Sequence, residues 1–190
     1  GVLVSQMKAG ARPDAYFSCD VSFMNDVKDL FDSPTNVSSN DMIILARNEM
    51  KGTIKTLNDL TGNGLRIGVA HPEKSALGAL TARLFEHLNL NLKKNLLLDS
   101  ATGDFLVNQL RAGSLDAVIV YRSNAMANPS TLEDAFIVDI DEPMAVAIQP
   151  FAIGSDSSHK NLMKRLLDAL TGNESRKDFI KYGFQWEIKS

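Results

Sequence analysis

Cysteine and histidine are scarce in this chain of 190 residues, which has one cysteine and three histidines. The single thiol, Cys19, excludes an internal disulfide and a thiolate cluster for a metal. We expect Cys19 to be a small buried side chain. His71, His87 and His159 share no ligand spacing. We therefore expect no metal ligands among the side chains and no cofactor.

The sequence also has no nucleophile beside a base. Asp14, Ser18 and Asp20 lie close together, but no histidine is near them in sequence. Nucleophilic catalysis requires a base within hydrogen-bond reach of the nucleophile. This absence favours a protein that is not an enzyme.

An excess of positive charge is missing as well. Twenty Lys and Arg residues against 23 Asp and Glu give a net charge of -3, so the chain has no electrostatic footprint for nucleic acid or an anionic membrane. No apolar run approaches the roughly 20 residues that span a bilayer. The first residues are typical of a helix start and not of a signal peptide. If the protein binds an anion, backbone dipoles must supply much of the stabilisation of its charge.

The apolar segments alternate between strand and helix patterns. We expect strands at 65–70, 96–98, 117–121 and 136–140, and helices at 21–32, 75–88, 104–112, 157–170 and 173–182. The alternation favours an α/β fold, with a mostly parallel sheet and helices on both faces. Two longer apolar strands, 42–46 and 144–153, have no regular helix after them. We interpret them as crossings between two lobes, with a ligand in the cleft.

Three strand ends carry the candidate binding residues. Ser75 is placed to cap the helix after strand 65–70, Gly78 allows close packing there, and Thr102 is placed to cap the next helix. Each junction presents free backbone N–H groups and the positive end of a helix dipole. Tyr121 ends the strand at 117–121. In an open parallel sheet such ends converge on one crevice, the usual ligand position.

Neutral donors such as amides and hydroxyls suit a fully ionised oxyanion. Phosphate, which can carry a proton, would also need an acceptor such as Asp, whereas sulfate, molybdate and tungstate would not. Each feature also has a plainer interpretation. Ser75 and Thr102 are helix caps first, and Tyr121 alone is typical of the edge of a core.

The run from Gln6 to Asp20 reads Q-M-K-A-G-A-R-P-D-A-Y-F-S-C-D, and Ile43 to Arg47 reads I-I-L-A-R. These segments resemble the periplasmic molybdate-binding proteins of ABC importers, in which the first reads Q-I-x-x-G-A-P-A-D-V-F-I-S-A-D and the second is the first inter-lobe strand. Thr56 to Leu60 with Leu65 to Glu73 is similar to the family's S-L-x-D-L…R-I-A-x-x-x-P-E. Val118 to Tyr121 matches the strand that ends in the ligand tyrosine, and Phe179 to Phe184 matches the closing F-x-x-Y-G-F.

The resemblance implies a type 2 periplasmic binding fold with two α/β lobes, the first comprising residues 1–43 and 146–190 and the second residues 44–145. It implies a monomeric, exported receptor that captures molybdate or tungstate and delivers it to an ABC transporter permease. The anion would be held by the backbone around Leu77, the backbone of Gly103 and the hydroxyl of Tyr121. Ser75 and Thr102 would add hydroxyls.

The chain also departs from the family pattern. The family's amino-terminal strand with its A-A-S-L serine has no counterpart, and Gly1 stands where the second of a pair of ligand serines would be. The first lobe is therefore expected to be incomplete, and residues 1–190 alone are expected to bind weakly. Leu77 is bulkier than the alanine usual in molybdate binders, which leaves the choice of oxyanion open.

Two other functions stay open at this point. A sensory or regulatory domain of the same fold would bind another small anion or an organic ligand and signal by closure. An organic carboxylate would need an arginine, for which the local candidates are Arg66, Arg83 and Arg122. An enzyme acting on the captured anion would need a nucleophile–base pair in the cleft.

Overall fold

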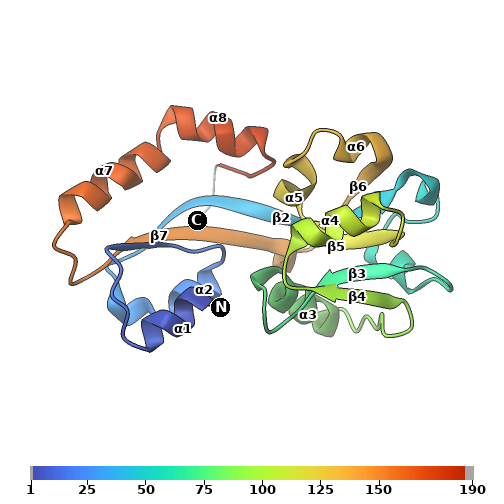
Figure 1. Ribbon diagram of the computed structural model, residues 1–190, viewed down its shortest axis with the longest axis horizontal. Helices are drawn as coiled ribbons and strands as arrows, with labels where there is room; N and C mark the ends of the chain where they lie inside the picture. Colours follow the sequence, from blue (N-terminus) through green and yellow to red (C-terminus); the bar gives the residue numbers. More distant parts are fainter. Residues whose placement is uncertain (1, 187–190) are drawn as a thin grey trace. The chain divides into compact units, whose positions relative to one another are not determined.

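The structure, a computed structural model, describes residues 2–186 in two compact units. Unit 1 comprises Gly1–Asn40 and Ala147–Ser190, and unit 2 comprises Asp41–Val146. Strand β2 (Thr35–Arg47) continues from unit 1 into unit 2, and β7 (Val146–Ile153) begins at the last residue of unit 2. The chain thus passes twice between the units, each time within a strand (Figure 1).

The described part of unit 1 is built on strands β1 (Ala15–Phe17), β7 and the first half of β2. Strand β1 pairs antiparallel with β7, which in turn neighbours β2. The helices of this unit are α1 (Val2–Lys8), α2 (Val21–Asn25), α7 (Lys160–Leu170) and α8 (Asn173–Lys181), with a 3₁₀ turn at Lys28–Leu30. Helices α1 and α2 and strand β1 contribute to a buried apolar cluster that includes Val4, Met7, Tyr16 and Met24.

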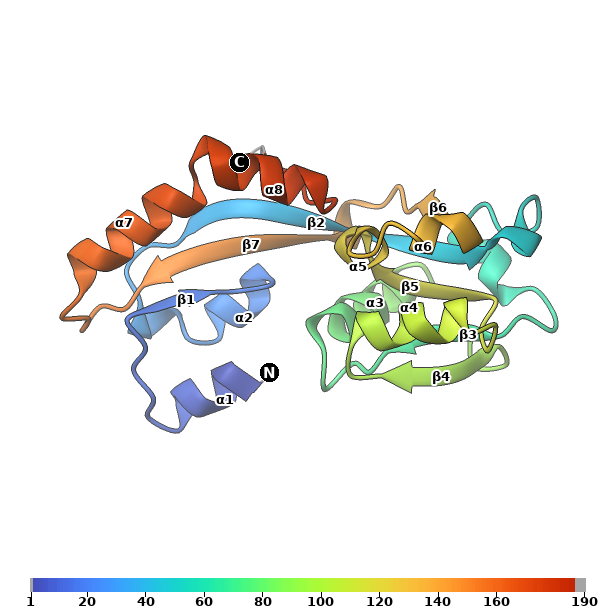
Figure 2. The same ribbon diagram turned by 45° about the horizontal axis from the view of Figure 1, so that its top comes forward.

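Unit 2 is a five-stranded sheet in the order β6-β2-β5-β3-β4. Strands β3 (Ile67–Ala70), β4 (Leu96–Ser100) and β5 (Ala117–Tyr121) are parallel, whereas β2 runs antiparallel to both β5 and β6 (Ala135–Asp139). Helices α3 (Ala76–His87) and α4 (Gly103–Arg111) cover opposite faces of the parallel strands (Figure 2). The connection from β3 to β4 and the connection from β4 to β5 run in opposite directions across the sheet. Because both are right-handed crossovers, their helices lie on opposite faces.

Shorter elements complete unit 2. Helices α5 (Arg122–Met126) and α6 (Thr131–Asp134) connect β5 to β6, and 3₁₀ turns lie at Asn48–Met50, Leu57–Thr61 and Pro143–Ala145. Within residues 2–186, no helix is long and apolar enough to cross a membrane.

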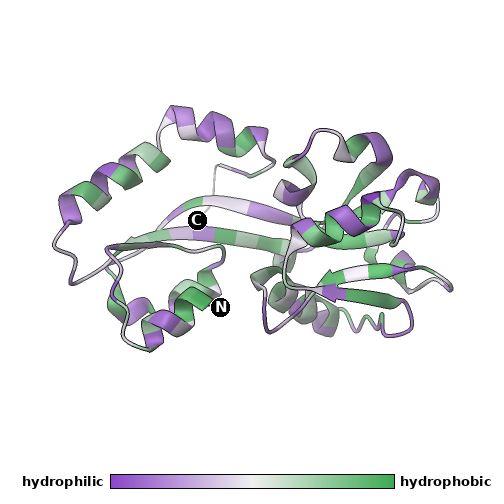
Figure 3. Ribbon diagram, in the orientation of Figure 1, coloured by the Kyte–Doolittle hydropathy of each residue, from purple (hydrophilic) through white to green (hydrophobic). Residues whose placement is uncertain are grey.

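The core of unit 2 explains why its central strands are almost wholly apolar. Residues 42–46 of β2 and 117–120 of β5 are fully buried, and β3 and β5 are coloured mainly as hydrophobic in Figure 3. Strands covered on both faces lose the alternation of polar and apolar residues. Continuous runs such as Met42 to Ala46 therefore indicated central strands correctly.

Three expectations were wrong. The sheet is less parallel than predicted, because β2 enters unit 2 antiparallel to β5 and β6. The helix expected at 21–32 is two short pieces, since the backbone leaves the helical region at Val27 (φ -133°). Cys19 is exposed, although Ser18 and Asp20 on either side of it are buried.

Candidate functional site

The candidate residues of unit 2 lie at the carboxyl ends of three adjacent parallel strands. Ala70 at the end of β3 is paired with Ser100 at the end of β4, and Gly68 is paired with Val118 of β5. Since β5 runs parallel to β3, its last residue, Tyr121, lies at the same edge of the sheet as Ala70 and Ser100. The starts of α3, α4 and α5 are therefore collected at one edge of the sheet, where ligands of open α/β sheets bind.

An ion pair at the opposite edge fixes the register of these strands. The buried carboxylate of Asp116, just before β5, accepts from the Arg66 backbone N–H at 2.8 Å and from the Arg66 guanidinium at 2.6 and 3.1 Å. The guanidinium hydrogen bonds lower the pKa of Asp116. Since Arg66 directly precedes β3, this pair aligns the starts of β3 and β5, and so their ends.

The first junction runs from β3 into α3. Ser75 has the extended backbone of an N-cap (φ -139°, ψ 138°), but its side chain makes no capping hydrogen bond. The first bond of the helix is donated by the Ala79 N–H to the Ser75 carbonyl, at 3.0 Å. The N–H groups before Ala79 are the ones that a helix leaves without an intrahelical partner. The hydroxyl of Ser75 is therefore not committed to the helix end.

Gly78 places this first turn close against the strand. A methyl group on Gly78 would lie 2.6 Å from the carbonyl oxygen of Ala70 and closer still to the carbonyl group of His71. Only a residue without a side chain permits this approach. The N–H group of His71 also donates to the Ser100 carbonyl at 2.7 Å, which joins this junction to the end of β4.

Leu77 lies in the same turn, but its side chain is 2% exposed and belongs to the core. Its backbone N–H lies at the start of α3, whereas its side chain is buried in the core. The size of residue 77 therefore adds volume to the core of unit 2 and not to the open edge of the sheet.

The second junction runs from β4 into α4. Thr102 is a true cap, because its hydroxyl oxygen accepts from the Phe105 N–H at 3.3 Å. Gly103 is the first helical residue, and a methyl group there would lie 2.5 Å from Oδ1 of Asn124. The plain capping interpretation thus holds for Thr102 and fails for Ser75.

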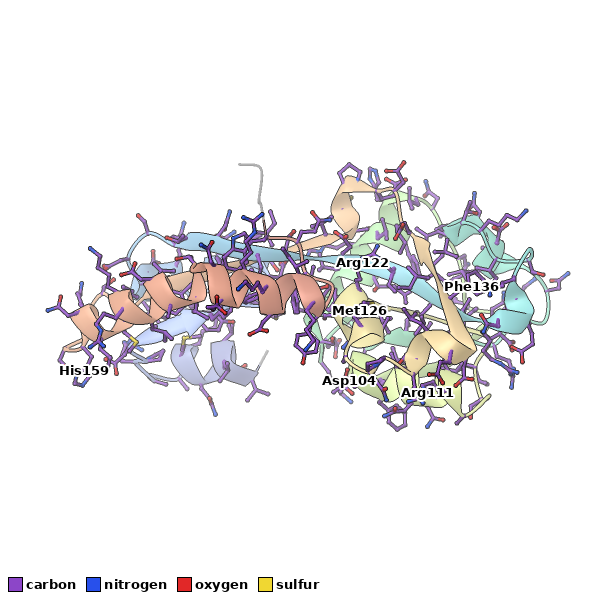
Figure 4. The ribbon with its side chains drawn as sticks, turned by 90° about the horizontal axis from the view of Figure 1, so that it is seen from above. Asp104, Arg111, Arg122, Met126, Phe136 and His159 are labelled. Atoms are coloured by element: carbon purple, nitrogen blue, oxygen red, sulfur yellow. The ribbon has the colours of Figure 1, made fainter. Side chains whose placement is uncertain are left out.

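The third junction is Tyr121 at the end of β5, opposite Met42 of β2. Its hydroxyl oxygen is buried, and its backbone N–H donates to Oδ1 of Asn124 at 3.1 Å. Helix α5 starts at the next residue. In Figure 4, Asp104, Arg122 and Met126 lie at one end of unit 2, where α4 begins and α5 passes.

Arg122, the cation beside Tyr121, is engaged in ion pairs. It contacts the carboxylate of Asp139, and its Nε lies 3.6 Å from Oδ2 of Asp41. Arg66 is likewise engaged by Asp116. Two of the three candidate arginines for binding an organic carboxylate are therefore already paired with carboxylates of the protein.

Metal and hydrolase sites find no support in residues 2–186. No group of three or more His, Cys, Asp and Glu side chains in this part of the chain is arranged to hold a metal ion. Ser18 donates to the Asp20 carbonyl at 2.7 Å, Asp20 caps α2, and Asp14 accepts from Ser157 at 2.7 Å. Each of these residues has a structural partner. Gly1, the remaining candidate, lies outside the described residues.

Residues 1–185 match the family of bacterial extracellular solute-binding proteins. The chain belongs to this family. Among curated relatives, the molybdate-binding protein ModA of Mycobacterium tuberculosis is 26% identical over 186 residues, which cover 96% of this chain and 69% of that protein. A putative ABC transporter substrate-binding lipoprotein of Bacillus subtilis, YvgL, is 23% identical over 193 residues, covering 98% of this chain and 73% of the relative.

Solved structures show the same fold. The periplasmic molybdate-binding protein of Azotobacter vinelandii superposes with a TM-score of 0.79 at 14% identity, covering 99% of this chain and 84% of that one. A periplasmic thiamin binding protein superposes with a TM-score of 0.83 at 11% identity, covering 100% and 71%. The predicted type 2 periplasmic binding fold is confirmed. Because the two neighbours are named for such different ligands, the fold does not select one.

Asn124 was missed by the sequence analysis, although it contacts two of the three junctions. Its spacing of three residues from Tyr121 is the signal that could have found it. An Asn three positions after a strand end can accept from the backbone N–H of that end, in the manner of a capping box. Helix α5 was itself not expected, because five residues are too few for a periodic pattern.

Proposed function

We propose that this protein is a solute-binding receptor that captures a tetrahedral oxyanion, molybdate or tungstate, for ABC-type import. The observation that carries the proposal is the convergence of three helix starts at the ends of β3, β4 and β5. Helix starts supply N–H donors and positive dipole ends to an anion. The ligand contacts would be the backbone of Leu77 and Gly103 and the hydroxyls of Ser75, Thr102 and Tyr121, with Gly1 carried over from the resemblance alone.

The donors favour a dianion without a proton. Ser75 keeps its hydroxyl out of the helix cap, and the Tyr121 hydroxyl is a neutral donor. Molybdate is favoured over other oxyanions by the names of the M. tuberculosis and A. vinelandii relatives. The bulk of Leu77 does not count against it, since that side chain packs into the core.

An organic carboxylate is the weaker candidate. Periplasmic binding proteins of this fold include one named for thiamin, so the architecture admits organic ligands. A carboxylate clamp at Arg122 would have to break ion pairs with Asp41 and Asp139. A sensory role for the same fold would leave the contacts unchanged and would differ in what the closed state signals.

The remaining parts of the proposal follow from the family. We propose an exported location, an ABC transporter permease as partner, no catalytic activity and a monomeric state. The lobe boundaries at residues 43–44 and 145–146 remain a prediction, with β2 and β7 as the hinge strands.

Calorimetric titration of the protein, as the cell makes it, with molybdate, tungstate, sulfate and phosphate tests this proposal. We expect tight binding of the first two. Tyr121→Phe removes a single hydroxyl, and the loss of a hydrogen bond to a charged ligand should weaken binding roughly ten- to a hundredfold. Tyr182→Phe is the matched control, because Tyr182 is an exposed residue of unit 1. Absence of heat with all four anions would refute the proposal.

A further inference from the structure

We propose that Asn124 is the positioning residue that holds the start of α4 against the end of β5; the inference rests on the oxyanion site proposed above. Its side-chain oxygen accepts from the Tyr121 N–H at 3.1 Å. Its side-chain nitrogen donates to Oδ1 of Asp104, the second residue of α4, at 2.8 Å. One amide group therefore joins two of the three segments that would supply ligand donors.

The packing at Gly103 shows how close this junction is. A Cβ atom on residue 103 would lie 2.5 Å from Oδ1, 2.8 Å from Cγ and 3.1 Å from Nδ2 of Asn124. The whole amide group thus lies over the Gly103 backbone. Asn124 occupies the space that a side chain at 103 would take, so the two residues are fitted to each other.

The hydrogen-bonding groups set the identity of residue 124. An acceptor must face the Tyr121 N–H, and a donor must face the Asp104 carboxylate. Asparagine offers both on one short side chain. Aspartate would offer only acceptors and would place a second carboxylate beside Asp104, which costs free energy through like-charge repulsion. Alanine would leave both partners without their bonds.

A positioning role predicts a loss of affinity that exceeds any loss of stability. The Gly103 amide and the Tyr121 hydroxyl must point at one anion together, and small misplacements of donors are costly in preorganised sites. Without Asn124, the start of α4 keeps its Thr102 cap and remains helical. The junction then loses its orientation and keeps its fold.

The experiment compares molybdate titrations of Asn124→Ala with those of Asn128→Ala. Asn128 lies in the same connection, and its side-chain oxygen accepts from the backbone N–H and the hydroxyl of Ser130, at 3.0 and 2.8 Å. We expect Asn124→Ala to bind about tenfold more weakly than wild type, with the urea midpoint of the ligand-free protein changed no more than in Asn128→Ala. Asn124→Asp should lose affinity as well.

A swapped pair provides the decisive readout. Asn124→Asp combined with Asp104→Asn exchanges donor and acceptor across the 2.8 Å contact and leaves the acceptor for the Tyr121 N–H in place. We expect it to recover most of the affinity that Asn124→Asp loses. Wild-type affinity in Asn124→Ala, or no recovery in the swapped pair, would overturn this inference while leaving the oxyanion receptor intact. If the wild type itself binds no oxyanion, the proposed function fails, and this inference fails with it.

Discussion

The contact between Gly78 and the end of β3 yields a prediction whose size follows from the structure. In Gly78→Ala the new methyl would meet the Ala70 carbonyl oxygen at 2.6 Å and the His71 carbonyl group more closely. These are backbone atoms of a buried strand end, so they cannot turn away as a flexible side chain would. Helix α3 must therefore shift, or β3 must bend.

Two opposing effects determine how much Gly78→Ala changes the free energy of unfolding. Alanine is the better helix former by about 1 kcal/mol, and overpacking a core costs about 1–3 kcal/mol. Because backbone atoms limit relaxation here, the cost belongs at or above the upper end of that range. We expect Gly78→Ala to lower the free energy of unfolding by about 2 kcal/mol.

Urea unfolding followed by far-UV circular dichroism measures this change. Ala79→Gly, one position along the same helix, is the control and should lose about 1 kcal/mol through helix propensity alone. The two substitutions exchange the same pair of residue types in opposite directions, so propensity alone would make Gly78→Ala stabilising. A Gly78→Ala protein as stable as wild type, or more stable, would refute the close approach of α3 to the strand.

Three further predictions concern single side chains. Thr102→Ala should lower the free energy of unfolding by about 1 kcal/mol through loss of a cap, whereas Ser75→Ala should leave it unchanged and weaken molybdate binding; urea unfolding and calorimetry on both variants check the contrast. Asn95→Ala should cost about 2–3 kcal/mol in urea unfolding, because its buried amide donates to the carbonyls of Leu60 and Gly62 at 2.7 and 2.6 Å. Asp116→Asn should destabilise at neutral pH and have little effect at low pH: the Asp116 pKa is lowered in the folded state, so its stabilisation is present above the unfolded pKa of about 3.9 and is lost as pH falls through the folded value. Equal losses at pH 7 and pH 2.5 would contradict this.

The sequence predicted the parallel part of unit 2 well, because the hydrophobic periodicity and the residues that end each element agree there. The strand at 117–121 coincides with β5, and the helices expected at 75–88 and 104–112 differ from α3 and α4 by one residue at each end. Long amphipathic helices and buried strands give strong patterns in one segment at a time. Antiparallel pairing of β2 involves strands far apart in sequence, so no local pattern contains it.

The candidate site was harder to predict, because its interpretation depends on which hydrogen bonds are made. Ser75 and Thr102 look alike in sequence, since each is a hydroxyl residue before a helix, yet Thr102 caps and Ser75 does not. Residue type gives the propensity to cap, and only geometry shows whether the hydroxyl is used. Asn124 was missed for a different reason: the bond to nearby Tyr121 gives it a local role only, and its second partner, Asp104 of α4, lies twenty residues earlier.

The backbone N–H groups of Leu77 and Gly103 in the proposed site leave few marks in a sequence. The side chain of Leu77 is 2% exposed and belongs to the core. The donor expected to face the anion is its backbone N–H, a group that every residue except proline carries. What places that donor is Gly78 against the strand, Arg66 with Asp116 at the far edge, and the end of β4 bonded to His71. Substitutions at these supporting positions should therefore alter binding more than a change in the size of residue 77. If the proposed oxyanion site is correct, its specificity should depend on the spacing of α3, α4 and Tyr121, which those contacts determine.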